Sequence, residues 1–337
     1  MIPERYRSHT DKTIVMVLPK WRASMVKKYN ASPPTNKWTW ATNRNTARLL
    51  SAEMSYLGDP EMRKDANVYI ITINNSHDGG ADEEISLVRE LRGNGAKVVA
   101  SCSEDSRFCS GIGLILDESS GKLFTDTLGE ADIILSGIPE WIKPYGRYQH
   151  KVVYVGSFLD VVNLAIPYRK RNIDILVAPE KEESGRNGLN AEFLLLLLEQ
   201  FPDSKICYCI RSSDRPPILD RLARGGVEIS SLPLRKLIPR ARVMVDLTFR
   251  PHSGRSLAEA WYYRTPFVSH IWSYYSRLFP EYSFGAFNMN EIADSCRTII
   301  NTNYEHIIRD AEAIAAEEYY YIARHKMMSR LYGECEK

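Results

Sequence analysis

The stretch ARVMVDLTFRPHSGRSLAEAWYYRTPFVSH, residues 241–270, decides the fold predicted for this chain. It opens with a short apolar run that is typical of a buried strand. A loop rich in small and basic residues follows, and the pattern then predicts a helix over residues 256–264. Thr265-Pro266 ends that helix before a second strand at residues 267–270. This order makes half of a doubly wound α/β unit, whose loop and positive helix end suit a phosphate.

The rest of the chain shows the same alternation of apolar strands and amphipathic helices, which predicts an α/β protein with parallel sheets. The alternation occurs in two series, so we expect two Rossmann-like domains that face each other across a cleft. Their predicted ranges are residues 1–165 and 166–303. Within the first series, residues 19–42 lack periodicity and predict a long loop, whereas residues 45–56 predict a helix.

The composition fits this division and narrows the class of protein. A chain of 337 residues favours two domains, and 44% apolar with 26% charged residues is ordinary for a soluble globular protein. No apolar run approaches the ~20 residues of a membrane span, and the first residues lack the apolar core of a signal peptide. The six cysteines show no metal-ligand spacing, and Cys207 and Cys209 are predicted to be buried thiols. We therefore expect a cytoplasmic protein, located in the host cell if it is viral.

Residues 241–270 resemble the donor-nucleotide signature of GT-B glycosyltransferases, in particular family 4, also called glycosyl transferase group 1. Gly254 takes the place of a signature glycine, residues 257–260 that of a Leu-Glu-Ala motif, and residues 264–268 that of a Gly-Thr-Pro-Val-Val turn. The resemblance implies a retaining glycosyltransferase whose donor substrate is a nucleotide-sugar such as a UDP-sugar, with no other essential cofactor. It also implies that the C-terminal segment, residues 304–337, is helical and crosses back to the first domain.

Glu259 falls on the glutamate that holds the ribose hydroxyls in the resembled family. The family's first glutamate would fall on Pro251, so that carboxylate is missing here. The same residues have a second interpretation, because Ser256 and Glu259 have the spacing of a capping box, in which the glutamate ties back the helix start. Both interpretations are open at this stage.

Departure of a nucleoside diphosphate leaves negative charge that fixed cations and N–H groups must stabilise. The loop after residues 173–177 supplies Arg186 and Lys181 as candidates, by the same resemblance, and a solvated surface loop is the alternative. Arg211 follows the next predicted strand. Further donor-binding candidates lie in the glycine loop of the opening stretch: Arg250, Ser253, Gly254 and Arg255. The sequence has no Asp-x-Asp motif, so we expect no essential metal.

His77 and Asp78 are the candidates for proton transfer, because they follow a predicted strand on a loop with two glycines. The resembled family also uses a histidine of its first domain to contact the transferred sugar. The alternative for Asp78 is a turn-forming Asp-Gly.

The first fifty residues carry an excess of positive charge. They contain ten Lys or Arg against two acidic residues, which is +8 in a chain of net charge +2. Basic side chains interleaved with tryptophans suit a phosphate backbone with a base lifted out for stacking, whereas a membrane surface would favour an apolar–basic helix. The first acceptor hypothesis is therefore a hydroxylated base in DNA, as in the phage enzymes that glycosylate DNA. The candidate acceptor-binding residues are Arg22, Lys27, Lys28, Trp38 and Trp40.

Three alternatives remain for the function. The acceptor can be a saccharide or small molecule, with the basic run merely solvated. The protein can be a sugar-nucleotide epimerase on the same fold, which needs no acceptor surface. It can also be a nucleotide-binding protein without activity, which the substitution at Pro251 allows.

Overall fold

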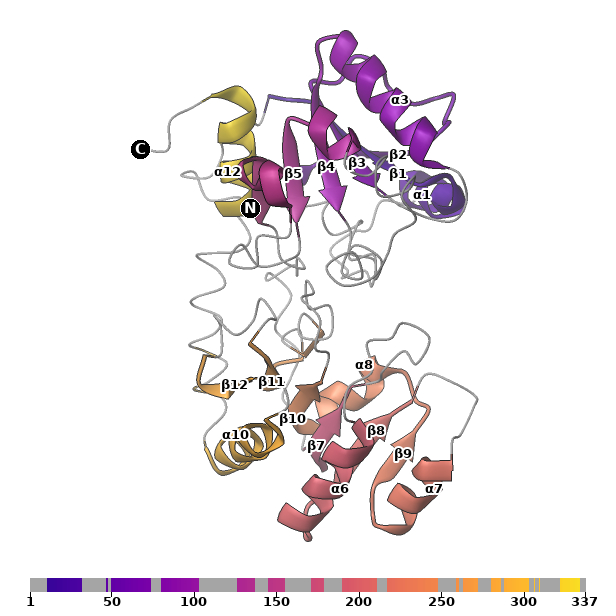
Figure 1. Ribbon diagram of the computed structural model, residues 1–337. Coiled ribbons are helices and arrows are strands. Elements are labelled where there is room, and N and C mark those ends of the chain that lie inside the picture. The colour runs from indigo at the N-terminus through magenta and orange to yellow at the C-terminus, as the bar shows by residue number, and fades with distance from the viewer. Residues whose placement is uncertain are drawn as a thin grey trace. The chain divides into compact units, whose positions relative to one another are not determined.

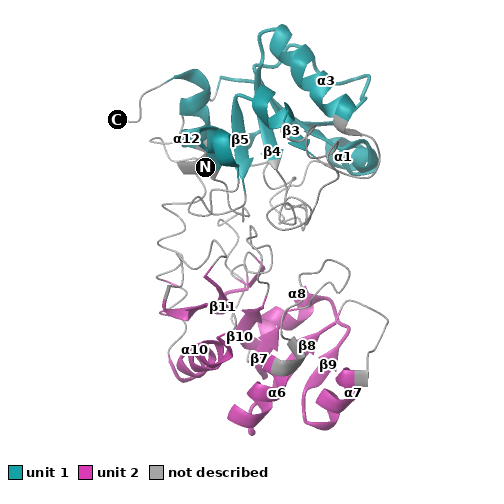
Figure 2. Cartoon of the chain, viewed as in Figure 1, with its two compact units in different colours: residues 1–160, 316–337 teal, residues 161–315 magenta. Residues whose placement is uncertain are grey.

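The computed structural model describes residues 11–31, 47, 50–73, 80–102, 126–136, 145–154, 171–178, 190–210, 217–247, 259–260, 263–271, 280–285, 288–302, 306, 309 and 322–333. The chain divides into two compact units (Figure 2). Unit 1 comprises residues 1–160 together with 316–337, and unit 2 comprises residues 161–315. Each unit is built on its own six-stranded sheet, and every strand pair in both sheets is parallel.

The sheet of unit 1 has the strand order β2-β1-β3-β4-β5-β6 (Figure 1). Its strands are β1 (Ile14–Leu18), β2 (Glu53–Tyr56), β3 (Val68–Ile73), β4 (Lys97–Cys102), β5 (Ile133–Ser136) and β6 (Val152–Tyr154). All six residues of β3 are buried. A continuous apolar run of this kind is typical of a parallel strand that is covered on both faces.

Helices cover both faces of this sheet. Leu87 and Leu91 of α3 (Gly80–Gly93) lie in one core cluster with Val15 of β1. On the other face, Met328 of α12 (Ile322–Tyr332) packs with Met16 of β1. The prediction that a C-terminal helix crosses back to the first sheet is therefore confirmed.

The structure corrects the long loop predicted over residues 19–42. A short helix, η2 (Lys20–Arg22), leads directly into α1 (Ala23–Ala31). Val26 is buried, and Met25 and Tyr29, one residue before it and three after it, pack against the same core. This narrow apolar stripe has helical spacing, but the lysines around it hide the periodicity in the sequence.

The structure also corrects the helix predicted over residues 45–56. Ala47 and Leu50 are helical, but Ser51 has φ 52° and ends the helix. The N–H of Ala52 then donates to the carbonyl of Ala47 at 2.7 Å, the hydrogen bond of a Schellman motif. The residues after it form β2, which pairs with β1. Serine rather than glycine stands at the turning point, so the sequence gives no sign of the stop.

The sheet of unit 2 has the order β12-β11-β10-β7-β8-β9. Its strands are β7 (Ile173–Val177), β8 (Ile206–Cys209), β9 (Glu228–Ser230), β10 (Ala241–Asp246), β11 (Phe267–His270) and β12 (Ser283–Phe284). Among the described residues, its helices include α6 (Asn190–Gln200), α7 (Pro217–Arg224), α8 (Leu234–Leu237), η7 (Ile238–Arg240), η9 (Pro280–Tyr282) and α10 (Met289–Asn301). The expected α/β class with two parallel sheets is therefore correct.

Arg171 joins three parts of unit 2 just before β7. One guanidinium nitrogen donates to the carbonyl of Ala241 at 2.6 Å and to the hydroxyl of Thr265 at 2.9 Å. The other donates to the carbonyls of Tyr263 at 3.3 Å and Arg264 at 2.5 Å. Arg171 thus holds the turn that enters β11 against the start of β10.

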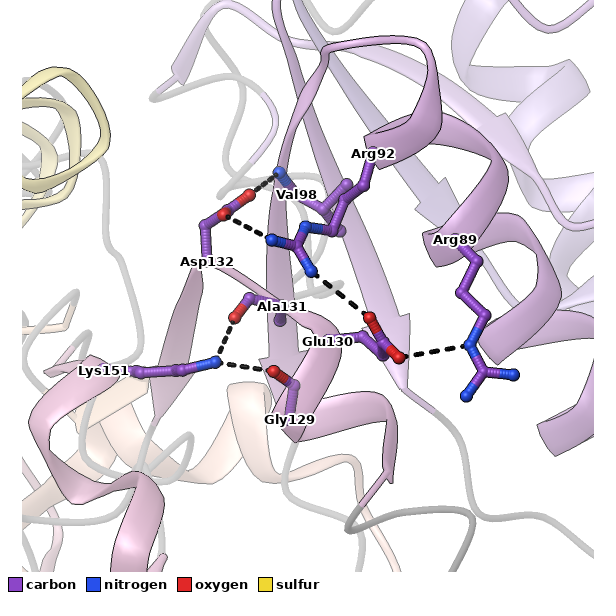
Figure 3. A network of polar contacts seen from close by, with 8 residues as sticks. All are labelled: Arg89, Arg92, Val98, Gly129, Glu130, Ala131, Asp132 and Lys151. Atoms are coloured by element: carbon purple, nitrogen blue, oxygen red, sulfur yellow. Dashed lines mark hydrogen bonds and ion pairs between the residues drawn. The ribbon is translucent and has the colours of Figure 1, made fainter.

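A polar network in unit 1 fixes the amino ends of β4, β5 and β6 (Figure 3). Lys151, at the end of η4 (Gly146–Lys151), donates from Nζ to the carbonyls of Gly129 and Ala131, at 2.7 Å each. Burial lowers the pKa of the Lys151 ammonium, and the nearby Arg92 guanidinium lowers it further. Arg92 also forms an ion pair with Glu130 at 3.3 Å. Ligand sites in open α/β sheets lie at the carboxyl ends of the strands, so this network is structural.

Replacing Lys151 with methionine is expected to lower the unfolding free energy by about 2 kcal/mol, because two carbonyls lose a charged donor. Urea denaturation followed by circular dichroism measures this change. The matched control is Lys97→Met, because Lys97 is an exposed lysine at the start of β4. Equal effects of the two substitutions would contradict the assigned role of Lys151.

Candidate functional site

The topology of unit 2 defines one place where the strand order reverses. From β7 the chain passes to β8 and β9 on one side, and then crosses to β10 and β11 on the other. Val245 of β10 is in register with Val177 of β7, so the carboxyl ends of these two strands lie level. Open α/β sheets bind ligands in the crevice at such a switch point.

Both predicted phosphate-binding segments leave the sheet at this switch point. The segment with Lys181 and Arg186 follows β7, and the glycine loop follows β10. Arg211 comes after β8, the other neighbour of β7. These residues themselves lie outside the described part of the chain, as do the candidates of the glycine loop: Arg250, Ser253, Gly254 and Arg255.

Glu259 is the one donor-binding candidate that the structure describes. It is helical, and only 5% of its surface is exposed. Its carbonyl accepts a hydrogen bond from the N–H of Tyr263 at 3.3 Å, in the last turn before Arg264. A carboxylate buried to this degree is not a solvated surface group, because burying its charge is costly unless partners compensate for it.

Three buried polar residues at the ends of β10 and β11 were not predicted. Asp246 is 6% exposed, and it is in register with Ser269, which is 3% exposed. His270 is 1% exposed, and its ring meets that of Phe284 edge-on at 5.4 Å. Asp246 and His270 are the last residues of β10 and β11, and Ser269 directly precedes His270. The carboxyl ends of strands are where open α/β sheets bind ligands. These three residues thus lie at the same edge of the sheet as the switch point.

The thiols of β8 are not reactive groups of this site. Cys207 and Cys209 are buried, as the sequence predicts. Burial raises the pKa of the Cys207 thiol to about 12, and the Glu228 carboxylate adds to the shift. At neutral pH this thiol is protonated, and a protonated thiol is a poor nucleophile.

Unit 1 has its own switch point, between β1 and β3. Val17 of β1 is in register with Ile71 of β3, and β2 lies on the far side of β1. The chain leaves β1 into η2, and it leaves β3 into residues 74–79. His77 and Asp78 belong to that second segment and lie outside the described residues, as do Trp38 and Trp40. The sequence-predicted proton-transfer and acceptor segments thus follow adjacent strands.

The segment that leaves β1 is basic. Residues 20–31 contain four Lys or Arg and no acidic residue. Lys27 and Lys28 are exposed on α1, and Arg22 is half-buried in η2. The guanidinium carbon of Arg22 lies 3.8 Å from the ring centroid of Trp21, and Trp21 is 54% exposed. These residues present positive charge and an aromatic ring just beyond the carboxyl end of β1.

Within the part of the chain that the structure describes, no three His, Cys, Asp or Glu side chains gather so that they could bind a metal ion. Among the same residues, no helix is both long and apolar enough to span a bilayer.

No protein-family model matches the sequence, and neither does any curated protein. The fold, however, is similar to that of solved glycosyltransferases. WaaG, described as a glycosyltransferase involved in lipopolysaccharide biosynthesis, has a TM-score of 0.56 at 13% identity, over 95% of this chain and 100% of WaaG. An alpha-glucosyltransferase in complex with UDP has a TM-score of 0.54 at 11% identity, over 91% of this chain and 96% of the other.

A mutant of S. aureus TarM, in complex with Fondaparinux, alpha-GlcNAc-glycerol and UDP, has a TM-score of 0.55 at 13% identity and matches 79% of this chain. The match spans only 55% of the length of TarM. At these identities the comparisons establish the architecture, and that architecture is GT-B.

Proposed function

We propose that this protein is a glycosyltransferase that moves a sugar from a nucleotide-sugar to an acceptor hydroxyl. The donor that we propose first is a UDP-sugar. The observation that carries the proposal is the switch point of unit 2. There the segments with the predicted phosphate-binding residues follow β7 and β10, and the buried Glu259 comes just after the second of them. The TarM mutant and the alpha-glucosyltransferase, both similar in fold, are complexes with UDP.

In the proposed reaction, the bond between the anomeric carbon and the diphosphate oxygen breaks, and the acceptor oxygen bonds to that carbon. Arg255 and Arg186 stabilise the charge that grows on the departing diphosphate, together with N–H groups near Gly254. Glu259 accepts hydrogen bonds from the ribose. In this proposal His77 or Asp78 takes the proton of the acceptor hydroxyl or contacts the sugar. Following the resemblance to family 4, we propose that the anomeric configuration is retained.

The proposed acceptor is a hydroxylated base in DNA. The support comes from the basic, aromatic segment that leaves β1 at the switch point of unit 1. A neutral saccharide would not need four cations there without a single acidic residue.

The direct test uses a UDP-sugar labelled in the sugar. The protein is incubated with duplex DNA that contains hydroxymethylated pyrimidines, with unmodified DNA of the same sequence, and with free saccharides. We expect label on the hydroxymethylated DNA alone. Label on a saccharide would show that the acceptor is a saccharide and not DNA. An isomerised donor would identify an epimerase. If no donor binds or reacts, the protein is not a glycosyltransferase.

DNA binding is expected to weaken steeply with salt, because each neutralised phosphate contributes about −0.9 to the log–log slope of affinity against salt concentration. The double substitution Lys27→Ala and Lys28→Ala should make this slope less negative by about 1.8 if each lysine contacts one phosphate. Fluorescence anisotropy of a labelled duplex across a salt series measures this slope. The control is Lys64→Ala with Lys97→Ala, which removes equal charge at residues that precede β3 and begin β4. A wild-type slope in the α1 double variant would exclude these lysines from the acceptor site.

A further inference from the structure

Trp21 is one of three large apolar side chains that are exposed among the described residues, along with Leu232 and Ile271. It is the aromatic one of the three, and the guanidinium carbon of Arg22 lies 3.8 Å from the centroid of its ring. Arg22 covers one face of this ring, and 54% of the residue nevertheless remains exposed. An exposed, flat aromatic face next to a guanidinium is typical of a platform for another planar ring.

The position of this pair is also informative. It lies in η2, directly after β1. The neighbour of β1 in the sheet is β3, the strand that leads into the segment with His77 and Asp78. On that neighbouring strand, the Thr72 hydroxyl is buried and has no hydrogen-bond partner among the described residues. Thr72 is the second-last residue of β3. A buried polar group without a partner at the carboxyl end of a strand is free to bind a ligand group.

The surroundings of Trp21 distinguish between planar ligands. The cations Lys20, Lys27 and Lys28 are exposed on the same segment, which carries no acidic residue. This favours an aromatic ring attached to phosphates over a neutral sugar.

A lipid surface fits this segment less well. Val26 is buried, and Met25 and Tyr29 pack on the core of unit 1, so the apolar side of α1 is already covered by protein. A membrane-binding helix needs that side for the acyl chains.

We propose that Trp21 and Arg22 form the platform on which a nucleobase of the acceptor strand stacks. This inference rests on the proposed function, because it names the ring that the acceptor site would recognise. Lys27 and Lys28 act on the phosphate backbone of the same strand, whereas Trp21 acts on the base alone.

The test compares two single-stranded probes of equal length and charge, oligothymidylate and an abasic oligomer. We expect Trp21→Ala to weaken oligothymidylate binding by about five- to a hundredfold, the value of one base–aromatic stack. Binding of the abasic probe should stay unchanged. Trp21→Phe should keep most of the wild-type affinity. Arg22→Lys, which keeps the charge without the planar guanidinium, should itself weaken oligothymidylate binding while leaving the abasic probe unaffected. The control Ile271→Ala removes an exposed apolar side chain from unit 2.

Equal loss on both probes would assign Trp21 a structural role and overturn the inference, as would unchanged binding of oligothymidylate. Trp21-dependent binding to vesicles of anionic phospholipid, without binding to either probe, would overturn it in favour of a membrane. Binding of UDP by the same variants is measured in parallel. A protein that binds oligothymidylate through Trp21 but binds no UDP-sugar would disprove the proposed transferase while the platform stands. Normal UDP binding, together with an effect of Trp21→Ala that is the same on both probes, would leave the transferase standing and disprove the platform.

Discussion

Replacing Glu259 with alanine is expected to weaken UDP binding by about ten- to a hundredfold. The physical reason is the loss of a charged hydrogen bond to the ribose, which is worth about 1.5–3 kcal/mol. Glu259 is nearly buried and belongs to the helix that follows the glycine loop. In the proposed complex, its carboxylate contacts the ribose of a nucleotide bound at the switch point of unit 2. Isothermal titration calorimetry with UDP measures the change.

The same position separates the ribose interpretation from the capping box. Glutamine at this place still closes a capping box, so Glu259→Gln should keep the melting temperature while losing the charged bond to UDP. Alanine should lower both affinity and stability, the latter by about 1 kcal/mol. If both variants bind UDP as the wild type does, Glu259 has no role in donor binding and only ties back the helix.

Replacing Arg171 with alanine is expected to lower the unfolding free energy of unit 2 by about 3 kcal/mol. Four hydrogen bonds are lost, and carbonyls that Arg171 satisfies at the entry to β11 lose a charged donor. For a unit of this size the melting temperature should fall by about 6–12 °C. Differential scanning calorimetry measures this shift, with UDP absent.

Arg242→Ala is the matched control for Arg171. Arg242 belongs to β10 and forms one ion pair, at 3.2 Å, with Asp174 of β7. Its side chain is 43% exposed, so the pair is worth about 1 kcal/mol or less. Lysine at position 171 should recover less than half of the loss, because it lacks the forked guanidinium. Equal shifts for Arg171→Ala and Arg242→Ala would contradict the bridging role.

The sequence predicts most of the fold because strands buried on both faces are continuous apolar runs. The ranges predicted for β7 and β11 agree with the structure. The helix over residues 45–56 was predicted too long, because its stop depends on a residue that rarely adopts positive φ. Ser51 and Arg264, both with φ 52°, are the two non-glycine residues of this kind among those described. At Arg264 the N–H of Thr265 donates to the carbonyl of Ala260 at 2.8 Å, so both helices end in the same motif.

For the candidate site, the order of the strands was enough to bring the predicted loops to the switch points, since a parallel sheet collects the loops at its carboxyl edge. The sequence does not mark Asp246 and His270 as site residues, because a single polar residue at the end of a strand is also typical of an ordinary turn. Only their burial, 6% and 1% exposed, shows that they are enclosed. The assignment of Glu259 to ribose depends on resemblance, because spacing alone fits the capping box equally well.

The return of α12 to the first sheet has a consequence for synthesis of the protein on the ribosome. Met327, Met328 and Leu331 belong to the same core as Ile14 and Val68, and all of unit 2 is encoded between them. At about 5–20 residues per second, unit 1 waits on the order of ten seconds or more for this last layer. Unit 2 is contiguous and can fold during that interval. A chain truncated before residue 322 would therefore carry a complete second unit and a first unit whose apolar face stays open to chaperones and proteases.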